Sequence, residues 1–95
     1  MNSEKMMITL TSLDFIRALM EHDVKFTMAP LYEGWQWRFP GTTLEDGDVA
    51  IHCGTYGLMS GHVESYCMPW DDDDVSVFKP DEMAQKIADA IRGTN

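Results

Sequence analysis

The stretch VKFTMAPLYEGWQWRF, residues 24–39, decides the fold class of this chain. Its first five residues alternate apolar and polar side chains, as a half-buried strand does, and Pro30 is expected to end that strand. Its last five residues alternate again, which places Trp35 and Trp37 on one face of a second strand. The connection is short enough for a hairpin, so the stretch predicts an antiparallel sheet with both tryptophans in the core.

A second hairpin is expected further along the chain. Residues 49–53 and 62–68 both alternate, and the glycine-rich segment GTYGLMSG joins them. If this segment turns the chain symmetrically, His52 lies opposite His62. A short run at 75–78, VSVF, predicts one more strand.

Helices are expected at both ends of this strand region. Apolar residues recur at helical spacing over about residues 12–22, with Thr11 or Ser12 as the capping residue. Pro80 is expected to begin a second helix and Gly93 to end it. The apolar face of this second helix consists of Met83, Ala84, Ile87, Ala88 and Ile91.

These elements follow one another in the order α-β-β-β-β-β-α. Their natural closure is an antiparallel sheet of 4–5 strands with two helices packed on one face, an α+β fold. Ninety-five residues leave no room for a second independent core, so residues 1–95 are expected to form a single compact domain.

Composition and charge narrow the classes of function. The chain is 44% apolar, enough for a modest core, and carries a formal net charge of −9. Residues 41–95 hold 11 acids and 3 bases, whereas residues 1–40 hold 5 acids and 4 bases. Such a field repels phosphate backbones and anionic lipid. We therefore expect neither direct nucleic-acid binding nor membrane association, and a basic protein surface is the expected partner.

The sequence also favours a cytoplasmic location. No apolar run is long enough to span a membrane. Charged residues, such as Asp14 and Arg17, interrupt the region where a signal peptide needs continuous apolar residues. Cys53 and Cys67 are compatible with reduced thiols, and the expected register places them too far apart for a disulfide.

Four consecutive aspartates, Asp71, Asp72, Asp73 and Asp74, form the most acidic part of the sequence. Counted as a calcium loop, the run has a valine and a serine where a ligand and a glycine are required. Two interpretations remain: a solvated turn between strands, which Trp70 anchors to the core, and an acidic patch that faces a partner. Under the second interpretation, Glu45, Asp46 and Asp48 form a further acidic cluster.

The histidines and cysteines carry no catalytic or metal-binding pattern. His52 and His62 are the candidates for a shared metal ion, but no third ligand accompanies them, and we expect no metal or cofactor. His52 cannot easily activate Cys53, because neighbouring residues in a strand point to opposite faces. The glycines that follow match no phosphate-binding fingerprint. We therefore expect a protein that is not an enzyme.

Small acidic α+β chains without a catalytic motif resemble accessory proteins that phages and mobile elements often carry. Some of those inhibit nucleic-acid enzymes by presenting carboxylates where phosphates would bind, so the resemblance, one of size and charge, implies an inhibitor of that kind. The leading hypothesis is a non-enzymatic protein-binding module for a basic surface. The alternative is a structural or homo-oligomeric domain that exposes Trp35 and Trp37 as an aromatic sheet face. A metal-binding protein that uses His52 and His62 comes third.

Overall fold

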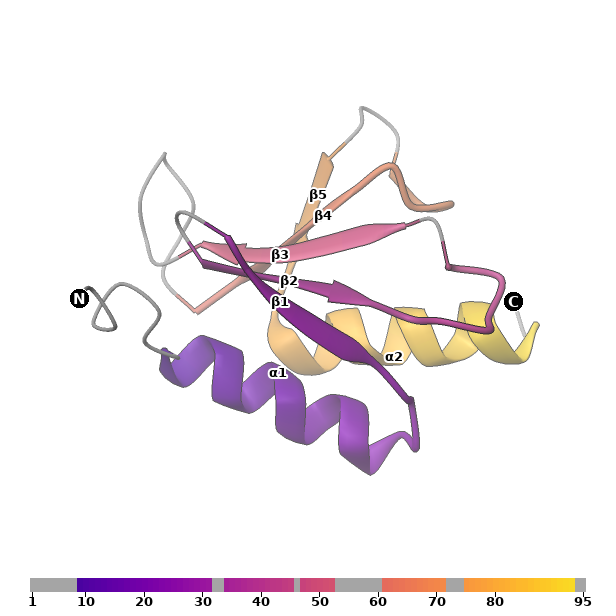
Figure 1. Ribbon diagram of the computed structural model, residues 1–95, viewed down its shortest axis with the longest axis horizontal. Helices are drawn as coiled ribbons and strands as arrows, with labels where there is room; N and C mark the ends of the chain where they lie inside the picture. The colour runs from indigo at the N-terminus through magenta and orange to yellow at the C-terminus, as the bar shows by residue number, and fades with distance from the viewer. Residues whose placement is uncertain (1–8, 32–33, 46, 53–60, 72–74, 94–95) are drawn as a thin grey trace.

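The computed structural model describes residues 9–31, 34–45, 47–52, 61–71 and 75–93 and shows two helices below one sheet (Figure 1). The elements are α1 (Leu10–Glu21), β1 (Thr27–Leu31), β2 (Gly34–Arg38), β3 (Asp48–His52), β4 (Val63–Tyr66), β5 (Val75–Phe78) and α2 (Pro80–Arg92). Each strand pairs with the next in the antiparallel sense, in the spatial order β1-β2-β3-β4-β5. The predicted α+β fold and its α-β-β-β-β-β-α order are confirmed.

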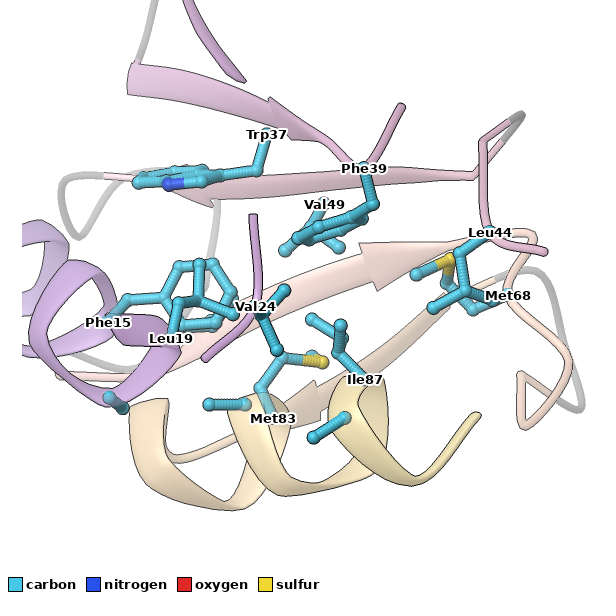
Figure 2. Packing of buried hydrophobic residues seen from close by; sticks show 14 of the residues in the cluster. Phe15, Leu19, Val24, Trp37, Phe39, Leu44, Val49, Met68, Met83 and Ile87 are labelled. Atoms are coloured by element: carbon cyan, nitrogen blue, oxygen red, sulfur yellow. The ribbon is translucent and has the colours of Figure 1, made fainter. Parts of the chain in front are cut away.

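The core lies between the sheet and the two helices. Trp37 of β2 is fully buried, and its ring meets that of Phe15 from α1 edge to face at a centroid distance of 5.0 Å (Figure 2). Trp35 lies on the same face and packs against the core from a partly buried position. The placement of the tryptophan pair in the core is therefore confirmed. From α2, the core receives Met83, Ala84, Ile87 and Ala88.

The structure corrects the expected end of the first strand. The strand was expected over residues 24–28 with Pro30 stopping it, but β1 begins only at Thr27, runs to Leu31 and pairs Pro30 with Trp35. Proline lacks the N–H group that a central strand must donate, so its place in an edge strand, paired on one side only, is the tolerated one.

The helix ends show one further correction. The N-cap of α1 is Thr9, whose hydroxyl oxygen accepts from the backbone N–H of Ser12 at 3.2 Å, so the expectation of Thr11 or Ser12 as the cap is wrong. For α2 the expected signals are confirmed: Pro80 is the first helical residue, and Gly93 follows the helix with a φ of 74°.

The second hairpin has the register that a symmetrical turn predicts. Asp48 pairs with Tyr66, and Ala50 pairs with Glu64. This register decides which side chains share a face. Because side chains alternate along a strand, these four residues lie on the face opposite to Trp37, which neither α1 nor α2 covers and which we call the helix-free face.

Candidate functional site

The acidic run meets the fold at Asp71, whose carboxylate stabilises the turn that follows β4. One oxygen, Oδ2, accepts from the backbone N–H of Met68 at 2.8 Å, and the other, Oδ1, accepts from the hydroxyl of Ser65 at 3.0 Å. The backbone N–H of Asp71 donates to the carbonyl oxygen of Met68 at 2.9 Å. Asp71 is half-buried, so both oxygens of its carboxylate act within the chain.

Trp70 completes this turn from the side of the core. Its indole Nε1 donates to the Ser65 hydroxyl oxygen at 3.2 Å, and its ring packs against the core from a partly buried position. Ser65 itself is fully buried, so it needs both of its partners. Ser65, Trp70 and Asp71 therefore form one connected group, which we call the turn anchor, and it agrees with the interpretation of Trp70 as an anchoring residue.

Two members of the second acidic cluster, Asp48 and Glu45, lie in different environments. Asp48 is partly buried on the helix-free face, and its Oδ1 lies 3.2 Å from Nη2 of Arg38 on β2. Glu45 is exposed in the loop before β3. Asp46 and the run Asp72, Asp73 and Asp74 lie outside the described residues. The structure thus places one member of each cluster, Asp48 and Asp71, in contacts with the chain itself.

The helix-free face contains a polar pair that the sequence interpretation missed. Glu64 and Tyr66 are two residues apart on β4 and share this face, and the Tyr66 hydroxyl donates to the Glu64 carboxylate. Burial raises the pKa of Tyr66 well above its ordinary value of 10.0, and the hydrogen bond and the negative charge of Glu64 raise it further. The signal was present in the alternation of HVESYC, but the helices had to be placed before this face could be identified.

Tyr66 gives the protein a pH dependence in the alkaline range. The unfolded chain releases the phenol proton near the ordinary pKa of 10.0, whereas the folded chain retains it, so stability is full below about pH 10 and falls above it. We expect a loss of about 1 kcal/mol by about pH 11. Urea unfolding of the wild type and of Tyr66→Phe across this range measures the effect. The variant should show a flatter dependence, and an identical slope in both proteins would contradict the assignment.

The strand register gives positions for His52 and His62, but the described residues supply no set of metal ligands around them. The register of β3 and β4, continued by two pairs beyond Ala50 and Glu64, places position 52 opposite position 62. The side chain of His52 and all of Cys53 lie outside the described residues. Within the part of the chain that the structure describes, no three His, Cys, Asp or Glu side chains gather as metal ligands.

The cations of the described residues are mostly engaged by the chain itself. The contacts are Arg17 with Asp14 at 3.9 Å, Arg38 with Asp48 at 3.2 Å, Arg92 with the carbonyl oxygen of His22 at 2.7 Å, and Lys86 over the rings of Phe78 and Trp70. The exposed acids without an ion pair inside the described ranges are Glu21, Asp23, Glu45, Asp81 and Glu82. The charge that the described residues present to solvent is therefore predominantly negative.

No protein-family model, curated protein or solved structure matches this chain. Neither of the two helices that the structure describes is long and apolar enough to cross a membrane.

Proposed function

We propose that the chain is a non-enzymatic protein-binding module that captures a partner through a basic surface on that partner. The observation that carries this proposal is the unbalanced charge. The formal net charge is −9, and four of the six described cations already have a partner within the chain. A surface of this kind accelerates encounter with a cationic protein and repels anionic ones.

A nucleic-acid-binding protein is one class of partner that fits. Such proteins present clustered lysine and arginine to phosphates, and the carboxylates of this chain would occupy those positions in competition with nucleic acid. This extends the proposal to an inhibitor, and it rests on charge alone.

The alternative function, self-association through an aromatic sheet face, would require Trp35 and Trp37 to be exposed. Trp37 is fully buried, and Trp35 packs against the core on the face that the helices cover. Neither residue offers the exposed aromatic patch that this alternative requires. Self-association would have to use other apolar residues, such as Leu10, Leu13 and Met20, which α1 exposes.

The test compares two triple variants that lose the same amount of charge. The first neutralises Asp72, Asp73 and Asp74 to asparagine, and the control carries Asp14→Asn, Glu21→Gln and Asp23→Asn. Basic proteins retained by the immobilised chain from a lysate are quantified at about 50 mM and about 500 mM salt. We expect high salt to release them, and the first variant to retain about tenfold less than the control.

One outcome would overturn the proposal, and a second would remove the aspartate run from the binding surface. Retention that is insensitive to salt would show that charge does not drive capture, because exposed charge pairs are screened at high ionic strength. Equal retention by both triple variants would show that the aspartate run has no special place in binding.

A further inference from the structure

We infer that the outer edge of β5 binds an extended, cationic segment of the partner, which adds a sixth strand to the sheet. This inference rests on the proposed function, because the charge of the partner is common to both. It adds a location, the edge of β5, and a mode of recognition, backbone pairing with a strand.

The sheet has two edge strands, β1 and β5, and only β1 contains a residue that hinders pairing with a further strand. β1 contains Pro30, which removes an N–H group from that edge. β5 has the sequence VSVF, without a proline or a charged residue. Val75 and Val77 are 36% and 43% exposed, so two strongly strand-forming side chains flank the open edge of β5.

The backbone of β5 provides the pairing groups. β5 pairs with β4 over Val75–Phe78, and no sixth strand lies on its other side in the sheet of the described residues. In an antiparallel ladder, alternate residues of an edge strand direct their N–H and C=O groups away from the neighbouring strand. An added strand would use these groups, and its own side chains would lie beside Val75 and Val77 on the helix-free face.

The charges around β5 select a cationic occupant. Asp71 precedes the strand, Asp81 and Glu82 follow it, and Glu64 lies beside Val77 in the pairing of β4 with β5. The cations nearby in sequence are Lys79 and Lys86, and Lys86 lies over the Phe78 ring at 5.3 Å from its centre. A second copy of this chain would bring its own charge of −9 to the same edge, so like-charge repulsion opposes a dimer through β5.

The probe is a short synthetic peptide that alternates lysine and valine. Its first control is the same peptide with alternate backbone amides methylated, which removes N–H donors and keeps the charge. Its second control is a peptide that alternates glutamate and valine. Binding is followed by the amide resonances of the labelled full chain during titration, with dissociation constants from the saturation curves.

Two protein variants locate the site. Val77→Lys places a cation at the edge of β5, and Leu31→Lys places the same cation on the same sheet face at the opposite edge, on β1. Both variants change the net charge equally and replace an exposed side chain. We expect Val77→Lys to weaken binding of the lysine peptide about tenfold and Leu31→Lys to change it less than about twofold.

Support for the inference is saturable perturbation of the β5 amides, with about tenfold weaker binding of the methylated peptide. Equal binding of the methylated peptide, or equal effects of the two variants, would overturn strand addition at β5 and leave the charge-driven function standing. Tight binding of the glutamate peptide would overturn the cationic occupant. A concentration-dependent dimer in sedimentation that Val77→Lys abolishes would assign the edge to a second copy. Salt-insensitive capture in the lysate experiment would remove the proposed function itself.

Discussion

Replacing Trp37 by alanine is expected to lower the free energy of unfolding by about 3–5 kcal/mol, a large part of the stability of a small domain. Trp37 is fully buried on β2, and its ring packs edge to face against Phe15 of α1. Removing the indole leaves a cavity between the sheet and α1 that neighbouring side chains fill only partly. Urea unfolding followed by circular dichroism gives the difference.

The matched variant is Trp37→Phe, which keeps a ring in place. The indole Nε1 of Trp37 is buried and has no hydrogen-bond partner among the described residues, so phenylalanine removes an unsatisfied donor and loses no hydrogen bond there. We therefore expect it to cost less than half as much as alanine. Equal losses in the two variants would show that a hydrogen bond of Nε1, and not ring packing, accounts for the stability.

Replacing Asp71 by alanine is expected to destabilise the chain by about 2–3 kcal/mol. The carboxylate accepts from the backbone N–H of Met68 at 2.8 Å and from the hydroxyl of Ser65 at 3.0 Å. Ser65 is fully buried, so its hydroxyl would lose an acceptor that water cannot readily replace. The same unfolding measurement applies, and Asp71→Asn, which keeps one acceptor oxygen, should lie between alanine and the wild type.

The sign of this effect separates two roles of Asp71. In a chain with a net charge of −9, removing one carboxylate relieves repulsion, so a purely electrostatic role predicts that Asp71→Asn stabilises the protein. Glu45→Gln provides the control, because it removes the same charge from an exposed side chain. We expect Glu45→Gln to change stability by less than about 0.5 kcal/mol. A stabilising Asp71→Asn would contradict the turn anchor.

Asp71 shows how the candidate site differs from what the sequence alone suggests. The four aspartates appear equivalent in sequence, yet Asp71 is bound within its own turn by Ser65 and Met68. That role depends on the turn after β4 bringing Ser65 back to a residue six positions later, which local spacing does not reveal. Glu64 and Tyr66 were missed for a related reason, since a strand alone does not show which of its faces the helices cover.

Much of the fold could be predicted because its signals are local. The alternation around Trp35 and Trp37, the register of β3 with β4 and the Pro80 and Gly93 boundaries of α2 depend on residues close in sequence. The errors occurred at Pro30 and at the cap of α1. A proline ends a central strand, but whether a strand is central is decided by the other strands of the sheet.

The sequence by itself determined the α+β class, the order of elements, the register of the second hairpin and the negative charge, because periodicity and composition belong to the chain. Only the tertiary structure decided which face of the sheet is covered, that β5 is an open edge, and that Asp71 faces inward. The physical reason is that these properties arise from contacts between distant segments. The packing of α1 and α2 against one face buries Trp37 and leaves Glu64, Tyr66, Val75 and Val77 on the other.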